Sequence, residues 1–227
     1  MESEANPKYL IAGMKSKLEG RNLDDVLNMD QTPIAFLYHS NMTLEVKGAR
    51  TVHSRASTTE TKHVTLAATV TASGKMLAPF VIFKGKPQGR IALCEFGMYP
   101  DAGRYACQEK AWMDESKMNE WIDAILQLWK ANRDKNKPSV KPPILILDAY
   151  RVHQTGSAVN RIQSMRIEVV HIPAGCVYLC QPIDVGINKP IKSCLLQKWE
   201  DRMMEGGGIV DGVANEPSCK LVVEWIV

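Results

Sequence analysis

The sequence lacks the features that mark membrane-spanning, secreted and nucleotide-hydrolysing proteins. None of its apolar runs approaches the roughly 18 residues that a membrane-spanning helix needs. Its first ten residues, MESEANPKYL, are polar and acidic, so we expect no secretion signal. No predicted strand is followed by the glycine-rich G-x-x-x-x-G-K-[ST] loop that binds nucleotide phosphates.

The spacing of the cysteines does not suggest a metal site or a disulfide framework. The chain has six cysteines among 227 residues. Cys176 and Cys180 are separated by three residues, but no second pair and no nearby H-x-x-x-H segment completes a zinc-binding pattern. Reduced thiols are therefore the expected state.

The composition indicates a folded globular chain. Hydrophobic residues make up 45% and charged residues 23%, and the formal net charge is +3. A chain of this length buries about 70% of its unfolded surface, which is enough for a substantial core. The charge is compatible with nucleic-acid binding, but it is weaker than the strongly basic balance that would itself predict such binding. The length predicts one large domain, or one domain plus an appendage.

Hydrophobic periodicity predicts a mixed succession of strands and helices. Alternating or continuous apolar runs predict strands at 26–33, 63–72, 77–83, 144–148 and 167–172, and a short hairpin at 42–54. Helical spacing predicts helices at 112–131, 153–165 and 182–204. Several glycines and prolines within 85–110 predict a long loop.

This order of elements predicts an α/β domain. Hairpin strands followed by alternating helices and strands favour a mixed sheet with helices on both faces, and the ribonuclease-H-like fold has this order. We expect the domain to span 23–205. It follows a linker or leading helix at 1–22, and it precedes a flexible glycine break and a truncated final element at 206–227.

Three aspartates stand at special positions in that order. Asp30 lies on the first strand, Asp148 ends the apolar run ILIL, and Asp184 lies near the start of a helix. Carboxylates on adjacent strand ends and a covering helix can meet at one point. Such oxygens hold the paired divalent cations of enzymes that cleave phosphodiesters. Aspartate is also common in turns, so position alone leaves a structural role open.

Five segments, in a consistent order, carry a resemblance to a known family. They are NMDQTP at 28–33, VTLAATVTASGKMLAPFVIFKGKP at 64–87, AWMDESKMNEWI at 111–122, LILDAYRVHQT at 145–155 and CQPIDVGINKPIK at 180–192. Together they resemble the catalytic domain of the DDE superfamily of transposase endonucleases, in the pogo, Tigger and jerky branch of the mariner-like elements. The last segment is the most specific, since family members look like LLQPLD-G followed by a lysine-bearing helix.

The resemblance implies a ribonuclease-H-like fold and a DNA-cleaving activity that uses two Mg²⁺ or Mn²⁺ ions. By matched position, Asp30, Asp148 and Asp184 take the catalytic and metal-binding roles. Family enzymes nick DNA at transposon ends, and the freed 3′-hydroxyl then attacks target DNA. The resemblance also implies DNA as partner, a homo-oligomer in complex with DNA, and a location in the nucleus. Because no apolar run is long enough to span a membrane, we expect no membrane association.

Some features depart from the family pattern. Family members usually carry asparagine after the second aspartate and often glutamate after the first, whereas this sequence has Ala149 and Gln31. Ala149 has no amide to orient the neighbouring carboxylate. Family proteins carry N-terminal helix-turn-helix domains that read DNA sequence, and 1–25 is too short for one. Because the chain also stops within an apolar element at Val227, we expect a fragment or a degenerate copy.

One histidine and several basic side chains are candidates for contact with nucleic acid. His153 matches a family histidine, which would lie near the metals or the scissile phosphate; a surface histidine at a helix start is the alternative. The basic candidates are Lys84, Lys86, Arg90, Lys189 and Lys192. Such side chains give salt-dependent, sequence-independent binding to phosphates, although a solvated surface is the alternative for each.

The sequence leaves three functions to weigh. The intact acids favour a metal-dependent DNA endonuclease or strand transferase descended from a transposon. The missing DNA-reading domain and the chain end favour a domesticated or decayed domain that binds nucleic acid or partners without cleavage. A nuclease acting on RNA–DNA hybrids is the third, and the QPID segment at 181–184 argues against it because that segment matches transposases.

Overall fold

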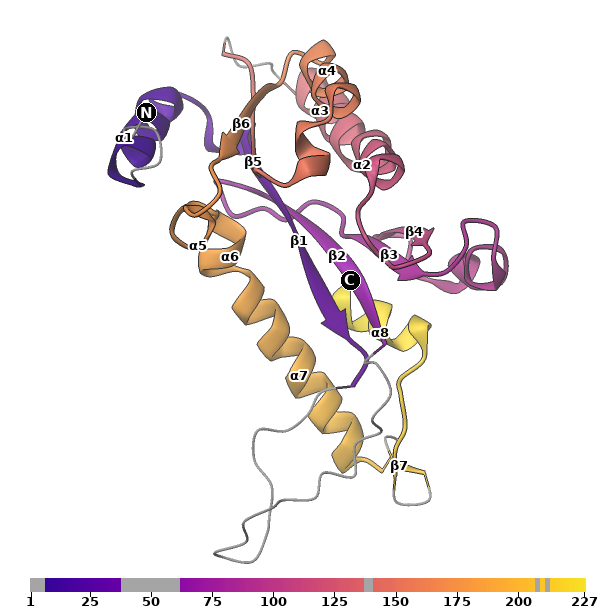
Figure 1. The fold of residues 1–227 in the computed structure, drawn as a ribbon. Helices are drawn as coiled ribbons and strands as arrows, with labels where there is room; N and C mark the ends of the chain where they lie inside the picture. Colours follow the sequence, from indigo (N-terminus) through magenta and orange to yellow (C-terminus); the bar gives the residue numbers. More distant parts are fainter. Residues whose placement is uncertain (1–6, 38–61, 137–140, 207–208, 211–212) are drawn as a thin grey trace, which may run out of the picture.

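A six-stranded mixed sheet of order β4-β3-β2-β1-β5-β6 forms the centre of the protein (Figure 1). The computed structural model describes residues 7–37, 62–136, 141–206, 209–210 and 213–227. The strands of the sheet are β1 (Val26–Ala35), β2 (His63–Thr71), β3 (Phe80–Lys84), β4 (Arg104–Gln108), β5 (Ile144–Asp148) and β6 (Glu168–Ile172). β1 pairs antiparallel with β2 and parallel with β5. β7 (Ile209–Val210) pairs antiparallel with β8 (Val213–Ala214).

Helices cover both faces of the sheet, as the sequence predicts. The helices are α1 (Pro7–Leu18), α2 (Glu115–Trp121), α3 (Gln127–Lys135), α4 (Gly156–Ser164), α5 (Val177–Cys180), α6 (Pro182–Gly186), α7 (Asn188–Met204) and α8 (Cys219–Ile226). In Figure 1, α2, α3 and α4 lie together on one side of the strands, and the long helix α7 runs along the other. A π-helical turn over Ile122–Leu126 joins α2 to α3.

Strand alternation sorts the side chains of β1 between the two faces. Leu27 and Met29 pack into the core cluster beneath α2 and α4. Val26 points to the opposite face, where it packs with Ile144 and Ile146 of β5. Because successive side chains of a strand alternate, Asn28 and Asp30 share the face of Val26. Two polar side chains therefore enter the buried part of this face.

The predicted strands at 63–72, 144–148 and 167–172 are confirmed, and the strand predicted at 26–33 extends further at its end. β1 continues past Pro33 to Ala35. Beyond Asn28 its register with β5 ends, so Pro33 lies where only β2 pairs with β1 and its missing N–H leaves no gap in a ladder. The third strand begins at Phe80 rather than at 77.

The predicted loop at 85–110 contains the edge strand β4 and two short helical turns. β4 pairs in parallel with β3, which requires the chain between them to cross back over the sheet. The turns at Ile91–Glu95 and Phe96–Met98 lie in this crossover. β4 is only five residues long and lies beside a glycine and a proline, so its pattern is hidden in the sequence.

The C-terminal helix α8 shares the core of the sheet. Cys219, Val222 and Val223 are buried in one cluster with residues of β2 and β3. Residues 219–226 thus pack against strands of the sheet. The helix predicted at 182–204 is divided at Ile187 into α6 and α7. The hairpin predicted at 42–54 lies outside the described residues. Within the described residues, no helix is both long and apolar enough to cross a bilayer.

Two tryptophans, Trp112 before α2 and Trp121 at its last position, test the packing of α2 on the sheet. Trp121 has 0% of its surface exposed and donates a hydrogen bond from Nε1 to Thr69 Oγ1 at 3.2 Å, whereas Trp112 is 58% exposed. Trp121→Ala should lower the free energy of unfolding by about 3–5 kcal/mol, because it leaves a large cavity. Trp112→Ala should change it by roughly 0.5 kcal/mol or less. Urea unfolding measures both, and equal losses would contradict the assigned burial.

Candidate active site

Asp30 and Asp148 lie side by side at one end of the sheet. β1 and β5 are parallel neighbours in which Asn28 pairs with Ile146, and each aspartate lies two residues further along its strand. Both therefore lie at the same level, on the face that Asn28 and Ile146 share. Asp148 is the last residue of β5 and its side chain is 23% exposed, whereas Asp30 is only 7% exposed.

Side-chain amides attach the short helix α6 to β1. Asn28 Oδ1 accepts a hydrogen bond from the backbone N–H of Ile183 at 3.0 Å, and its Nδ2 donates to the Ile146 carbonyl at 3.0 Å. Gln181 Nε2 donates to the Met29 carbonyl at 3.3 Å. We call Asn28, Gln181 and Ile183 the amide latch. It holds the first turn of α6, which carries Asp184, against the strand that carries Asp30.

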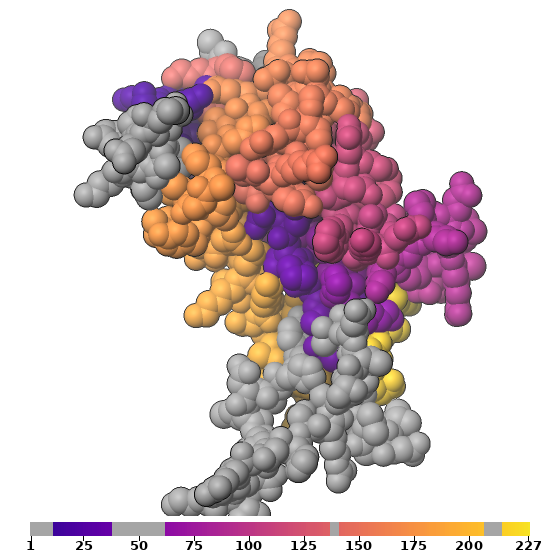
Figure 2. Space-filling view, in the orientation of Figure 1, coloured from indigo at the N-terminus to yellow at the C-terminus, as the bar shows by residue number. Residues whose placement is uncertain are grey.

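Asn188 connects the two carboxylates that the amide latch brings together. Its Nδ2 donates to Asp184 Oδ1 at 2.7 Å and lies 3.4 Å from Asp30 Oδ2. Asn188 is the first residue of α7 and follows Asp184 by four residues, so both side chains point the same way. Asp184 itself is exposed. Figure 2 shows the indigo atoms of β1 at the surface in the middle of this face, beside the orange segment of α5 and α6.

The close approach of the acids makes Asp30 difficult to ionise. Burial, together with the negative charges of Asp184 and Asp148, raises the pKa of Asp30 from its ordinary 3.8 to about 7. In the described part of the chain, neither Asp30 nor Asp184 pairs with a lysine or arginine. Among the residues that the structure describes, Asp30 and Asp184 thus concentrate negative charge without an ion pair to a lysine or arginine.

His153 holds Asp148 in place. Its Nδ1 lies 2.5 Å from Asp148 Oδ1, and its Nε2 lies 2.6 Å from Gln31 Nε2. Because the Gln31 amide nitrogen is a donor, His153 Nε2 accepts and its Nδ1–H donates to Asp148. Burial alone would raise the pKa of Asp148, but the bond from His153 and one from the Tyr150 N–H outweigh it, so the pKa lies below its ordinary value.

The structure therefore brings the three predicted acids together and places His153 beside one of them. The expected proximity of His153 to the acids holds, but its predicted contact with nucleic acid was wrong, because its side chain is fully buried. The alternative, a surface histidine at a helix start, was wrong for the same reason. The sequence analysis did not identify Asn188. A polar residue four positions after a helical aspartate lies on the same side of the helix, so its side chain can contact that aspartate and the groups beside it.

The predicted basic residues divide into two groups. Lys189 and Lys192 are exposed on the first turns of α7, directly after Asn188. Lys84, Lys86 and Arg90 are exposed at the far end of β3 and in the segment that follows. β3 lies two strands from β1. Phe83 of β3 pairs with Val64 of β2, and Val64 pairs with Ile34 of β1. Lys84 therefore lies beyond the level of Asp30. The sheet therefore does not bring the second group to the acids.

The acids fit a divalent cation by their chemistry. Mg²⁺ binds one or two carboxylates and completes its shell with water and phosphate oxygens, and carboxylates are the oxygens that this site offers. Two further oxygens nearby, Asn188 Oδ1 and Gln181 Oε1, are buried without a hydrogen-bond partner among the described residues. Within the same residues, no three histidine, cysteine, aspartate or glutamate side chains are arranged to ligate one ion.

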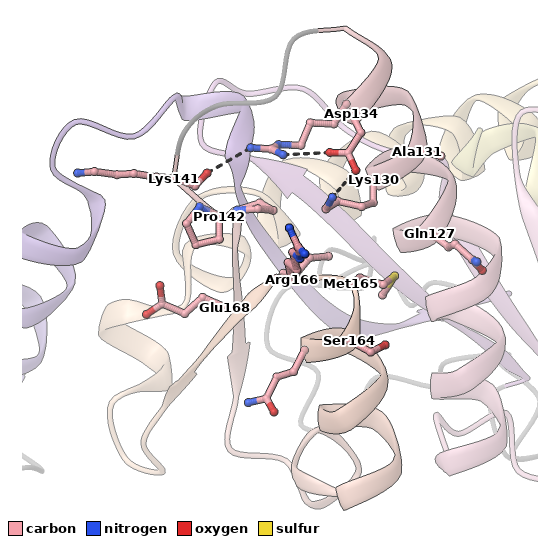
Figure 3. Close-up of a pocket in the computed structure, with 14 residues that line it drawn as sticks. Gln127, Lys130, Ala131, Asp134, Lys141, Pro142, Ser164, Met165, Arg166 and Glu168 are labelled. Carbon is pink, nitrogen blue, oxygen red and sulfur yellow. Dashed lines mark hydrogen bonds and ion pairs between the residues drawn. The ribbon is translucent and has the colours of Figure 1, made fainter.

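A separate hollow of about 1100 Å³ lies at the opposite end of β5 (Figure 3). It is bordered by the end of α3, the segment that precedes β5, and the end of α4. Figure 3 shows Lys130 directed at Asp134. Arg133 donates to Asp134 Oδ1 at 3.1 Å and to the Lys141 carbonyl at 3.3 Å. Its basic groups are largely engaged within the protein, so the acidic end of the sheet is the candidate active site.

The pKa of Asp30 predicts a dependence of stability on pH. Since its folded pKa of about 7 exceeds the ordinary 3.8, the stability that protonated Asp30 contributes is fully present below about pH 4 and is lost as pH rises through 7. Asp30→Asn removes this charge. Without divalent metal, the variant should be more stable than the wild type at pH 8 by a few kcal/mol, and the difference should shrink toward pH 4. Thermal unfolding by circular dichroism measures it, and identical pH profiles would contradict the account.

Two substitutions of His153 separate its two contacts. Asparagine places an amide nitrogen near the position of Nδ1 and keeps the bond to Asp148, whereas glutamine places one near Nε2 and loses it. His153→Gln should weaken Mn²⁺ binding by about 10–100-fold, the usual effect of losing a group that orients a metal ligand. His153→Asn should bind Mn²⁺ nearly as tightly as the wild type. Titration calorimetry compares them, and equal affinities would show that the bond to Asp148 does not matter.

Comparison with known proteins places this geometry in a family. Residues 60–227 match the model of the DDE superfamily endonuclease, a range that includes Asp148 and Asp184. The human "Pogo transposable element with KRAB domain" is 27% identical over 204 residues, which are 88% of this chain and 31% of that protein. The mouse protein of the same name is 26% identical over 204 residues, covering 88% of this chain and 32% of that protein. The chain thus spans about a third of the length of these relatives.

Solved structures show the same fold. A pre-cleavage Mos1 transpososome superposes with a TM-score of 0.57 at 12% identity and covers 97% of this chain and 57% of that chain. The catalytic domain of Mos1 mariner transposase has a TM-score of 0.53 at 11% identity and covers 98% of this chain and 84% of that one. The predicted ribonuclease-H-like fold is therefore confirmed. By its family match, the chain is a catalytic domain of the transposase kind and belongs to the DDE superfamily of endonucleases.

Proposed function

We propose that this domain cleaves and joins DNA strands by phosphoryl transfer that depends on two divalent cations. The observation that carries the proposal is the meeting of three carboxylates from β1, β5 and α6 at one end of the sheet. Burial and the charges of its neighbours raise the pKa of Asp30. A cation would relieve this repulsion.

Each acidic residue has a distinct role in this proposal. Asp30, which interacts electrostatically with both other acids, would be shared between two Mg²⁺ or Mn²⁺ ions, with Asp148 and Asp184 each completing one site. When bound, such ions activate water as a nucleophile and stabilise the leaving oxygen. His153 fixes the orientation of Asp148, and the amide latch fixes α6, so both carboxylates are positioned before substrate arrives.

The relatives support a nucleic-acid substrate and a divalent metal. Similar structures include a Mos1 paired-end complex with the left transposon end, and Mos1 mariner complexes with Mn and with Mg, each with a TM-score of 0.56. By analogy, DNA would lie across the exposed side of Asp184 and Asp148, with Lys189 and Lys192 contacting its phosphates. A second copy of the chain would join in a paired complex on DNA, and the protein would act in the nucleus.

One observation favours the second candidate, a domain that binds nucleic acid without cleavage. Position 149 carries a methyl group instead of the amide usual in the family, so Asp148 depends on His153 and the Tyr150 N–H for its orientation. If these two contacts do not hold Asp148 in a productive orientation, the domain would lose cleavage and keep the charged surface that binds nucleic acid.

A nicking assay separates the two candidates. Purified chain incubated with supercoiled plasmid and Mn²⁺ should convert it to the open circle. Asp148→Asn should reduce the rate about 10²–10³-fold, because it removes a charge that the reaction requires. Asp201→Asn, which alters an exposed aspartate of α7, serves as the matched control and should leave the rate unchanged.

The other outcomes are equally informative. Nicking that persists in Asp148→Asn would exclude the proposed site. If neither protein nicks but both shift DNA in gels, with an affinity that falls steeply with salt, the domain binds DNA without cutting it.

A further inference from the structure

The break between α6 and α7 places a neutral side chain between two of the acids. Ile187 interrupts the helix, and Asn188 starts α7 with only 9% of its surface exposed. Its amide nitrogen is the one group in the described structure that bonds to both Asp30 and Asp184. His153 donates a hydrogen bond to Asp148, and Asn188 donates hydrogen bonds to the other two acids.

The two neighbouring carboxylates determine which end of the Asn188 amide faces them. With Nδ2 toward the carboxylates, the side chain donates to two acceptors, at 2.7 Å and 3.4 Å. The opposite orientation would direct Oδ1 at two carboxylates, which repel it and cannot donate when ionised. The oxygen therefore points away from the acids, where it is buried without a partner among the described residues.

Asp184 needs such a partner more than Asp30 does. Asp30 is buried on a central strand, whereas Asp184 is exposed on a five-residue helix. Mutual repulsion would turn the exposed carboxylate outward into solvent. A donor that binds both groups offsets the repulsion and keeps them at one separation.

We propose that Asn188 is a positioning residue that holds Asp30 and Asp184 together, ready to share a divalent cation. It acts as a hydrogen-bond donor to the two carboxylates and does not ligate the metal through its oxygen. This inference rests on the proposed function, since it assigns the acids to a cation. It extends the site to a residue outside the acidic triad.

Three variants and Mn²⁺ binding test this role. Asn188→Leu keeps the size of the side chain and removes the donor, and Asn188→Asp keeps an oxygen and removes the donor. Gln197→Ala is the matched control, because Gln197 Nε2 also donates to a carboxylate four residues away on α7, Asp201 Oδ1, at 2.9 Å. Electron paramagnetic resonance of free Mn²⁺ gives the affinity of each folded protein, and thermal unfolding gives its stability.

The role of Asn188 as donor predicts that both Asn188 variants bind Mn²⁺ about 10–100-fold more weakly than the wild type, while Gln197→Ala binds equally well. A loss of stability in Asn188→Leu with unchanged Mn²⁺ affinity would overturn the inference and leave Asn188 a purely structural residue. Affinity in Asn188→Asp equal to or above that of the wild type would overturn it by identifying an oxygen ligand.

The failure of the proposed function would look different. If the wild-type protein binds no Mn²⁺, or if Asp148→Asn leaves its Mn²⁺ binding intact, the cation site itself is overturned, and the inference with it. Wild-type binding that Asp148→Asn abolishes but Asn188→Leu leaves unchanged would overturn the inference alone.

Discussion

The attachment of α6 to β1 by buried amides is the interaction on which the site depends. Asp30 and Asp148 lie next to each other through ordinary parallel pairing, which needs no special side chains. Asp184 comes from a separate segment, and it reaches them because Asn28 binds the Ile183 N–H and Gln181 binds the Met29 carbonyl. Neutral amides suit this task, since they satisfy buried backbone groups without adding charge to a site already crowded with carboxylates.

The charge at this end of the sheet is a cost to the folded protein. The raised pKa of Asp30 reflects that cost, and the lowered pKa of Asp148 shows how hydrogen bonds from His153 and the Tyr150 N–H can reverse it. Protein sites that sacrifice stability in this way commonly serve a function. Under the proposed function, a pair of divalent cations would correct this charge imbalance.

Much of the fold was predictable because strong local patterns specify it. Four apolar residues before Asp148 indicated a central strand, and QPID indicated the acid-bearing helix. β4 was missed because a five-residue edge strand has too few buried positions for a clear alternation. The contacts of His153 with Gln31 and of Asn188 with Asp30 could not be predicted from sequence, since they join segments far apart in the chain. Basic residues such as Lys84 were grouped with the site by charge alone, whereas sheet register separates them from it.

The most direct test is a crystal structure of the chain grown with Mn²⁺, in which anomalous scattering locates the metal. The account predicts manganese peaks in contact with Asp30, one on its Asp148 side and one on its Asp184 side, with Asn188 still donating to a carboxylate. Manganese bound elsewhere, or acids that stay in place at saturating Mn²⁺ without any peak between them, would contradict it.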